Sequence, residues 1–279
     1  MFIRWMQNNA FCGLLCLSVL VTIDLVHTAP DTASTKKGLG SSKKRYMCED
    51  LEKFTNIAWW YDWGDSNAYH AGQGCTNPLK ENRIPMIWGW RDNPEKRFQF
   101  SERSEYVLGF NEPNHHKQAY MSPQDAAIRW RELETAGKAN GAIYFGSPAA
   151  APGGDSYIEW FDTFFELCTD CQIDFLATHS YNCKATGVMN FLTNLWERYG
   201  KKIWLTEFAC PHTTDPNDQL NYMKELLPLL EEADFVERYA WYCNRLTDPN
   251  GYVKPSASLL EADEAKLTPL GEYYNNFNP

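Results

Sequence analysis

The sequence predicts an α/β fold in the form of a single (β/α)8 barrel of the TIM type. Eight short apolar runs, rich in β-branched and aromatic residues, alternate with segments of helical periodicity. The 279 residues are compatible with one such barrel, which runs to about 250 residues. An open doubly wound sheet is the alternative, but it usually carries a Gly-rich phosphate loop after its first strand. Gly72 and Gly74 do not begin a convincing helix of that kind.

The predicted strands are apolar segments with a high β-propensity, bounded by turn residues or by helical patterns. No internal repeat and no second linker divides the chain. The strands are predicted at residues 54–60, 84–90, 106–112, 142–147, 173–181, 203–209, 236–243 and 257–260.

Four helices carry clear local signals. The first begins at Ser122, an N-cap residue followed by a proline and an early acidic residue, and covers residues 122–138. Gly200 is the expected stop of another helix, and Asp215 with the proline after it is a start signal. The other three helices are predicted at residues 157–167, 188–199 and 218–232, and the segments after the first two strands are weaker helices.

The N-terminal residues are typical of an export signal. Arg4 precedes an uncharged, mostly apolar run at residues 10–23, which suits a signal-peptide core but is shorter than the roughly 20 residues that span a bilayer. A signal anchor is the alternative. We assign residues 1–29 to the signal peptide, residues 30–45 to a flexible polar and basic leader, and residues 46–279 to the (β/α)8 domain. The mature protein is expected to be secreted, extracellular and not membrane-bound.

The cysteine count agrees with an oxidising compartment. Two of the nine cysteines leave with the signal, and the other seven predict three disulfides and one free thiol with the pairing left open. Cys168 and Cys171 are expected to form a structural disulfide, because zinc would need a second matching pair and a redox site a thioredoxin-like context. We therefore predict no metal. The seven are Cys48, Cys75, Cys168, Cys171, Cys183, Cys210 and Cys243.

Charge and aromatic content narrow the choice of partner. The net charge of −10 makes nucleic acid a poor partner, since phosphate backbones are bound by basic surfaces. The 11 Trp and 15 Tyr suit a carbohydrate cleft, in which an aromatic face stacks on a sugar ring, although core packing also absorbs such residues. No dehydrogenase or kinase motif is present, so no cofactor is expected. We expect a monomer that binds a polysaccharide.

Two predicted strands end in a glutamate, Glu112 in YVLGFNE and Glu207 in IWLTE. Reactive side chains of this architecture lie where strands end at the carboxyl rim. Alternate residues of a strand share a face, so each glutamate is expected to top an apolar column that points into the barrel. Partial desolvation there raises a carboxyl pKa unless hydrogen bonds compensate. The residues of the two columns are Leu108, Phe110, Ile203 and Leu205.

Two strands lie between the glutamate-bearing strands, so Glu112 and Glu207 are expected to face each other across the mouth of the barrel. A separation of roughly 5–5.5 Å would suit a retaining glycosidase, and about 6.5–9.5 Å an inverting one. The alternative for either residue is a rim salt bridge with an Arg or Lys.

Four sequence blocks together resemble the glycoside hydrolase family 128 catalytic domain, a group of secreted β-1,3-glucanases. The blocks are GFNEPN at 109–114, DFLATHSY at 174–181, IWLTEFA at 203–209 and YAWYC at 239–243. The resemblance covers the chain from about residue 54 to the C-terminus. It implies a retaining barrel enzyme in which Glu112 is the acid/base and Glu207 the nucleophile. Asn114 departs from the pattern, since many relatives have an acidic residue there.

Other residues at the strand ends are candidate substrate contacts. Asn111 suits a hydrogen bond to a sugar 2-hydroxyl, with a turn-stabilising role as the alternative. His179 suits the orientation of the sugar or of the acid, with a structural role equally open. Tyr181 suits donation to Glu207, which would hold that carboxylate ionised. The Trp candidates, each of which core packing explains about as well, are Trp60, Trp88 and Trp241, whereas Trp59 and Trp204 are expected to face the helices.

We therefore expect a retaining endo-β-1,3-glucanase. A retaining hydrolase of another β-linked polymer, such as mannan, is the alternative within the same fold. A glucan-binding protein without activity is the alternative from another class, and the presence of both glutamates argues against it.

Overall fold

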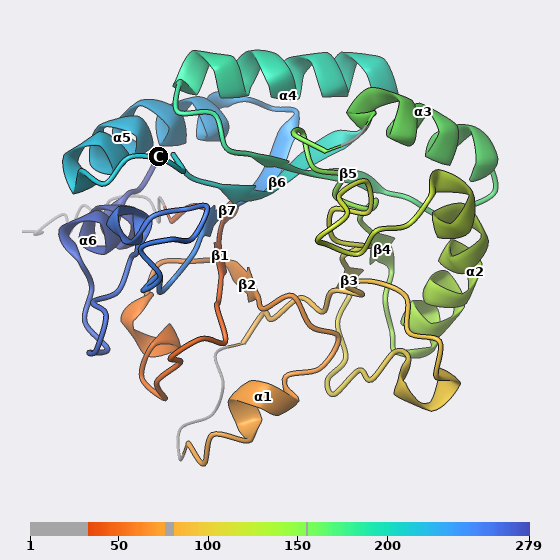
Figure 1. Ribbon diagram of the computed structural model, residues 1–279, viewed down its shortest axis with the longest axis horizontal. Helices are drawn as coiled ribbons and strands as arrows, with labels where there is room; N and C mark the ends of the chain where they lie inside the picture. Colours follow the sequence, from red (N-terminus) through yellow and green to blue (C-terminus); the bar gives the residue numbers. More distant parts are fainter. Residues whose placement is uncertain (1–32, 76–80, 155) are drawn as a thin grey trace, which may run out of the picture. The chain divides into compact units, whose positions relative to one another are not determined.

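The computed structural model describes residues 33–75, 81–154 and 156–279, and Figure 1 shows the described part as strands surrounded by helices. The predicted signal peptide at residues 1–29 lies outside the described residues. The strands are β1 (Lys37–Gly40), β2 (Trp59–Tyr61), β3 (Tyr106–Val107), β4 (Tyr144–Phe145), β5 (Phe175–Ser180), β6 (Lys202–Phe208) and β7 (Val236–Tyr242). The helices are α1 (Ala68–Ala71), α2 (Pro123–Ala139), α3 (Tyr157–Leu167), α4 (Ala185–Tyr199), α5 (Pro216–Glu232) and α6 (Pro269–Asn276), with 3-10 turns η1 (Leu51–Lys53), η2 (Pro94–Lys96) and η3 (Pro255–Ala257).

The strands pair in parallel, which confirms the α/β class. Five strands form one sheet in the order β2-β1-β7-β6-β5, and β3 pairs with β4. Further parallel bridges join Trp60 to Arg83, Met86 to Leu108 and Gly146 to Phe175. Parallel neighbours need crossover connections, and α3, α4 and α5 supply them between β4 and β7. The carboxyl ends of these strands therefore meet at one edge.

The predicted flexible leader is wrong over its middle, because Lys37–Gly40 forms β1 between β2 and β7. The segment KKGLG has weak β-propensity, and pairing with two distant strands overrides that preference. Gly38 is required there, since a Cβ atom would lie 2.2 Å from the Trp59 ring. The Lys37 ammonium is buried and donates to backbone carbonyls of Tyr274 and Phe277 at the end of α6. Burial lowers the pKa of Lys37 to about 8.

Six of the predicted strands overlap β2 to β7, and the other two are not regular strands. The segment 84–90 forms only the isolated bridge at Met86, next to Pro85, which has no N–H to donate. The segment 257–260 follows η3, and its Leu260 pairs with Leu267 in an antiparallel bridge.

All four predicted helices are present, and their ends match the local signals. Ser122 caps α2 by accepting from the Asp125 N–H, and Asp215 caps α5 by accepting from the Asn217 N–H. Gly200 ends α4 in the left-handed conformation. Helix α6 was not among the predicted helices; its cap, Thr268, accepts from the Gly271 N–H.

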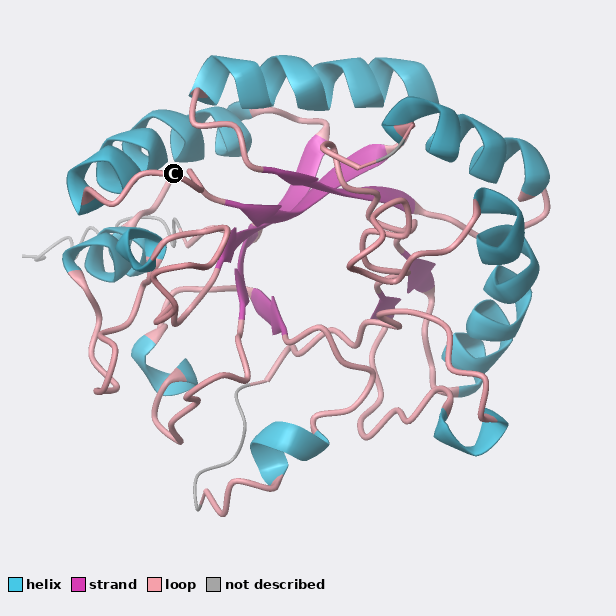
Figure 2. Cartoon of the chain, in the orientation of Figure 1, coloured by secondary structure: helices cyan, strands magenta, loops and turns pink. Residues whose placement is uncertain are grey.

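Side chains on the two faces of the strands enter different clusters. In β2, β6 and β7 successive residues alternate between a large cluster that includes the helices and a smaller one built from strand residues. Figure 2 shows the long helices outside the strands, and residues of α2 to α5 belong to the large cluster. The smaller cluster contains Trp59, Tyr61, Ile84, Met86, Leu108, Phe175, Trp204 and Ala240. Trp59 and Trp204 thus face away from the helices, so the prediction that they face the helix layer is wrong.

Three disulfides join Cys48 to Cys75, Cys168 to Cys171 and Cys183 to Cys210, while Cys243 is free and buried. The predicted count and the predicted Cys168–Cys171 bridge are confirmed. Within the described ranges, no helix has both the length and the apolar character that a bilayer crossing needs.

Candidate active site

A cavity of about 1260 Å³ lies at the edge where the strands end. Its wall includes Ser180 at the end of β5, Glu207 in β6 and Tyr242 at the end of β7. Glu112, from the segment after β3, lines the same cavity. The fold thus brings both predicted glutamates together in one solvent-accessible site, as the strand-end argument requires.

The Glu112 side chain is aimed by an unusual backbone. Its φ angle of 43° is left-handed, a conformation that non-glycine residues adopt rarely and that recurs at functional sites. The Glu112 N–H donates to the Ala149 carbonyl oxygen at 2.9 Å, and this bond ties the segment to the one after β4. Its carboxylate Oε1 lies 2.8 Å from His179 Nδ1. The side chain is 12% exposed, so it reaches the cavity.

Glu207 enters the cavity because the register of β6 shifts. Leu205 and Phe208 both pack on the helix side, although three positions separate them and strict alternation would place them on opposite faces. The pairings of β6 with β5 and with β7 are both irregular at this point. Such bulges re-aim side chains beside active sites. Here the irregularity turns Glu207 away from the helices.

Two side chains donate hydrogen bonds to the Glu207 carboxylate. Trp63 Nε1 donates to Oε1 at 2.6 Å, and the Tyr181 hydroxyl donates to Oε2. Both donors orient the carboxylate and favour its ionised form. The Glu207 side chain is only 5% exposed.

His179 lies behind the two carboxylates and contacts both. Its Nδ1 atom faces Glu112, and its Nε2 atom lies 3.5 Å from Glu207 Oε1. One carboxylate oxygen of each glutamate and a ring nitrogen of His179 all lie within 4.8 Å of one another. The imidazole is fully buried, so it acts on the carboxylates and does not face the open cavity.

The charges of this group shift the pKa values in opposite directions. Burial acts to raise the pKa of both carboxyls. At Glu112 the hydrogen bond and positive charge of His179 outweigh burial, so the pKa is lowered. At Glu207 burial prevails, helped by the negative charge of Glu112, and the pKa is raised. Burial acts to lower the pKa of His179, but Glu207 and Glu112 together raise it.

Among the described residues, Glu112, His179 and Glu207 are the cluster close enough to hold a metal ion. Their hydrogen bonds do not suit a cation. An N–H and an O–H already point at the Glu207 oxygens, and His179 Nδ1 is engaged with Glu112. A metal would have to displace these donors.

The remaining predicted site residues divide into three groups. Trp88, Asn111 and Tyr181 line the cavity with the two glutamates. His179 touches the carboxylates from behind. Trp60 and Trp241 are fully buried in the large cluster with the helices, so their prediction as substrate contacts is wrong. The Trp241 indole Nε1–H donates internally, to the Ala257 carbonyl oxygen at 2.8 Å.

The predicted apolar columns beneath the glutamates are also wrong. Ile203 and Leu205 pack on the helix side, whereas Glu207 faces the cavity. Leu108 and Phe110 lie in different clusters. The irregular register and the left-handed residue interrupt the period of two, so neither glutamate continues the face of the residues before it.

Four aromatic residues of the cavity wall were missed from the sequence: Trp63, Phe191, Tyr242 and Tyr252. Trp63 follows β2 by two residues and has a φ angle of 58°, a turn that no local pattern signals. Tyr242 ends β7, and the period of two would have found it once Trp241 was known to face the helices. Tyr252 lies in a loop, where periodicity gives no signal.

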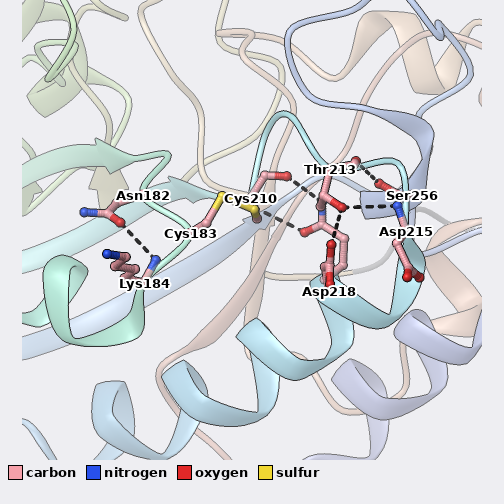
Figure 3. The surroundings of a disulfide bond; sticks show 9 residues. Asn182, Cys183, Lys184, Cys210, Thr213, Asp215, Asp218 and Ser256 are labelled. Carbon is pink, nitrogen blue, oxygen red and sulfur yellow. Dashed lines mark hydrogen bonds between the residues drawn. A yellow bond between two sulfur atoms is a disulfide. The ribbon is translucent and has the colours of Figure 1, made fainter.

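A disulfide connects the loops that follow β5 and β6. Figure 3 shows the bond between Cys183 and Cys210. Cys183 lies two residues after Tyr181, and Cys210 lies three residues after Glu207. Buried Gln219 of α5 holds the Cys210 backbone from below, accepting from its N–H and donating to its carbonyl. Ser256 donates to the Thr213 carbonyl oxygen at 2.6 Å, which ties the same loop to the segment after β7. These bonds join the three loops that follow β5, β6 and β7.

Comparison with known proteins identifies relatives. A family model described as glycosyl hydrolase catalytic core matches residues 38–274. A curated relative, alkali-sensitive linkage protein 1 of Schizosaccharomyces pombe, is 31% identical over 241 residues. This match covers 80% of the chain, and the chain spans only 41% of that relative's length.

Several solved structures share the fold. An endo-β-1,3-glucanase of glycoside hydrolase family 128, subgroup II, from Sorangium cellulosum is 28% identical with a TM-score of 0.70, covering 86% of this chain and 98% of that one. Its counterpart from Pseudomonas viridiflava is 31% identical with a TM-score of 0.67, covering 87% and 98%. A subgroup I enzyme from Amycolatopsis mediterranei, solved with laminarihexaose, is 25% identical with a TM-score of 0.67, covering 87% and 99%. These matches confirm the resemblance to family 128.

Proposed function

Because this chain belongs to the glycosyl hydrolase catalytic core family, and is therefore a glycoside hydrolase, we propose that it cleaves internal bonds of β-1,3-glucan with retention of configuration. The observation that carries the proposal is the pair Glu112 and Glu207 on one open cavity, with an oxygen of each within 4.8 Å of the other. A spacing of about 5–5.5 Å between carboxyl groups is that of retaining enzymes, since inverting enzymes need room for a water.

Glu207 is the nucleophile in this proposal. It attacks the anomeric carbon as an ionised carboxylate and forms a covalent glycosyl-enzyme. The two hydrogen bonds from Trp63 and Tyr181 support this role, because they orient the oxygens and stabilise the negative charge.

Glu112 is the acid/base. Its protonated form donates to the departing oxygen, and its ionised form then deprotonates the water that releases the sugar. In the free protein Glu112 has the lower pKa of the pair, so the acid form has to arise when substrate binds. Bound sugar displaces water and raises the pKa of Glu112, and His179 Nδ1, which carries a proton in the imidazolium form, lies 2.8 Å from Glu112 Oε1. His179 thus supplies the proton to Glu112.

The similar solved structures support the proposed β-1,3 linkage and the proposed cleavage at internal bonds. Two of the similar structures are endo-β-1,3-glucanases of subgroup II, and a third holds laminarihexaose. A cavity of about 1260 Å³ is large enough for several sugar units. The net charge of −10 is compatible with a neutral polysaccharide.

The proposal includes a closed barrel of eight parallel strands. The sheet from β2 to β5 continues to β4 through the Gly146–Phe175 bridge and then to β3. Bridges at Met86 and Arg83 lead from β3 back to β2. The segment 83–86 would complete the set of eight with β1, in place of the predicted 257–260 strand. We also propose that the enzyme is secreted and monomeric; the predicted signal peptide and the three disulfides support secretion.

Product analysis tests the function. Purified protein is incubated with laminarin, mannan and chitin, and the first-formed product anomer is followed by NMR. We expect reducing ends from laminarin alone, first in the β configuration. Release of the α anomer first would refute retention. Release of reducing ends from mannan alone would mean that mannan, and not β-1,3-glucan, is the substrate. Binding of laminarin without release of reducing ends would indicate a glucan-binding protein without hydrolytic activity.

Chemical rescue separates the roles of the two glutamates. Glu112→Ala and Glu207→Ala should each lower turnover on laminarin by about a thousandfold or more. With an aryl glycoside of a good leaving group and added azide, the Glu112 variant should yield a β-glycosyl azide and the Glu207 variant an α-glycosyl azide. The opposite pattern would exchange the two roles.

A further inference from the structure

Tyr252 is a large aromatic side chain of the cavity wall, and it is 60% exposed. It has no role in the reaction proposed for Glu112 and Glu207. It lies in the loop between β7 and η3. A single exposed aromatic on an open surface is ordinary. Tyr252 differs because it borders the cavity that holds both glutamates, where a bound ligand would cover its ring.

The loop that carries Tyr252 is held in place by its own hydrogen bonds. The Gly251 N–H donates to the Asp248 carbonyl oxygen at 3.1 Å, and the Lys254 ammonium donates to the Gly251 carbonyl oxygen at 3.0 Å. The Lys254 N–H donates to the Pro211 carbonyl oxygen at 3.2 Å, which joins this loop to the one after β6. The ring is therefore preorganised, and little conformational entropy of the loop would be lost when a ligand binds.

Neighbouring rings set where Tyr252 lies relative to the carboxylates. The centroid of its ring is 5.3 Å from that of Tyr181 and 5.2 Å from that of His212, both in edge-on contact. The Tyr181 hydroxyl donates to Glu207. One aromatic ring thus separates Tyr252 from the proposed nucleophile.

A second exposed aromatic adjoins the other glutamate. Trp88 is 37% exposed and lines the cavity, and its carbonyl oxygen accepts from the Asn111 N–H at 2.8 Å, next to Glu112. A nucleophile bonds to the glycosyl part of the substrate, whereas the acid protonates the leaving group. Burial and the charge of Glu112 both raise the pKa of Tyr252, so the charge of Glu112 also reaches this ring. The ring contact with Tyr181, the donor to the proposed nucleophile, is therefore the observation that assigns Tyr252 to the glycosyl side.

We propose that Tyr252 is a stacking platform for a glucose unit on the glycosyl side of the scissile bond, with Trp88 serving the leaving-group side. The inference rests on the proposed β-glucan hydrolysis and adds which residues bind the glucan chain on each side of the scissile bond. A pyranose ring presents a face of C–H groups, which packs on an aromatic face with little loss of hydration.

Kinetics with two substrates test the platform. Laminarin fills both sides of the site, whereas an aryl β-laminaribioside places sugars only on the glycosyl side. Tyr252→Ala should lower kcat/KM on both substrates by about tenfold or more, mainly through KM, because a stacking contact is lost. Tyr252→Phe keeps the aromatic face and should stay within about twofold of the wild type. Trp88→Ala should impair laminarin more than the aryl substrate.

The matched control is Tyr120→Ala, since Tyr120 is 67% exposed and does not line the cavity. It should leave both kcat/KM values unchanged, and all variants should keep the thermal melting temperature of the wild type. Unchanged kinetics in Tyr252→Ala would overturn the platform. A loss on laminarin alone would move Tyr252 to the leaving-group side and overturn the assignment.

Calorimetry with laminarihexaose keeps this test separate from that of the proposed function. If the wild type cleaves neither substrate, the proposed hydrolysis fails, and binding to Glu207→Gln with and without Tyr252→Ala still measures the platform. Weaker binding in the double variant supports it. Equal binding, or no binding to Glu207→Gln, overturns it.

Discussion

At the scale of single residues, the site depends on how burial and hydrogen bonding compete at Glu207. Burial disfavours the charged carboxylate, and the Trp63 and Tyr181 donors favour it. His179 adds a positive charge that both glutamates share. The chemistry of the pair is therefore set by the residues that contact it from behind.

Removing the Tyr181 hydroxyl should weaken the nucleophile. Tyr181→Phe leaves Glu207 with one donor, so its pKa rises further and less of it is ionised. A hydrogen bond to a charged group contributes about 1.5–3 kcal/mol, so kcat/KM should fall roughly ten- to hundredfold. The acidic limb of the pH–rate profile should move to higher pH, because the ionised form is the active one.

The control for this substitution is Tyr222→Phe, which removes another buried hydroxyl, one without a hydrogen-bond partner in the described part of the chain. It should change neither kcat/KM nor the pH profile. An unshifted acidic limb in Tyr181→Phe would mean that the hydroxyl does not act on Glu207.

The titration of His179 should occur above the ordinary histidine range. Burial lowers its pKa, but Glu207 and Glu112 outweigh burial and raise it. Because the folded pKa exceeds the unfolded value of about 6.5, protonation stabilises the fold fully below that pH. This contribution is lost as the pH rises through the folded pKa. An NMR titration assigned with His179→Asn should show the raised midpoint, and Glu207→Gln should lower it; a midpoint below the ordinary value would contradict the contact.

At the scale of elements and loops, the active site is assembled from segments that the strands bring together and that side chains then tie. The Cys183–Cys210 bridge, drawn in Figure 3, joins the loop after β5, which carries Tyr181, to the loop after β6, the strand that carries Glu207. Gln219 anchors one of these loops on α5. We therefore expect the disulfide to position the Tyr181 donor on the Glu207 carboxylate as well as to stabilise the chain.

Replacing both cysteines of this bridge with serine should lower activity as well as stability. The loops gain freedom, so Tyr181 spends less time in contact with Glu207 and kcat should fall about tenfold. Cys48→Ser with Cys75→Ser is the matched control, since both bridges span 27 residues and remove similar entropy from the unfolded chain. Both double variants should lose about 2–4 kcal/mol in urea unfolding. Equal kcat in the two, measured well below their melting temperatures, would leave the Cys183–Cys210 bridge with a stabilising role alone.

At the scale of the whole described unit, β1 holds the sheet together although it comes from a polar N-terminal segment. It pairs with β2 on one side and with β7 on the other. Leu39 is fully buried in the large cluster, and Lys37 satisfies carbonyls at the end of α6. Loss of β1 would break the sheet between β2 and β7 and leave buried polar groups without partners.

Truncation tests this role. A chain that begins at Ala33 should fold, whereas one that begins at Ser41 should not, because it lacks β1 and Lys37. Far-ultraviolet circular dichroism and urea unfolding measure the difference. Leu39→Ala in the longer chain should cost about 2–5 kcal/mol, which checks the contact without truncation. Cooperative unfolding of the Ser41 chain would show that the sheet does not need β1.

Local features of this protein were predictable from the sequence. Helix limits follow from caps such as Ser122 and Gly200, whose hydrogen bonds span only a few residues. The two catalytic candidates were identified because a polar residue at the end of an apolar strand is itself a local pattern. The number of disulfides followed from counting, although the pairing did not.

Only the tertiary structure decided which face each strand residue takes and which distant segments meet. The irregular register of β6 turns Glu207 into the cavity, and the same geometry buries Trp60 and Trp241 against the helices. The place of β1 and the contact of His179 with both glutamates depend on pairings far apart in the chain. The physical reason is that periodicity and capping act within a few residues, whereas register and pairing depend on the energy of contacts between segments that meet only in the folded chain.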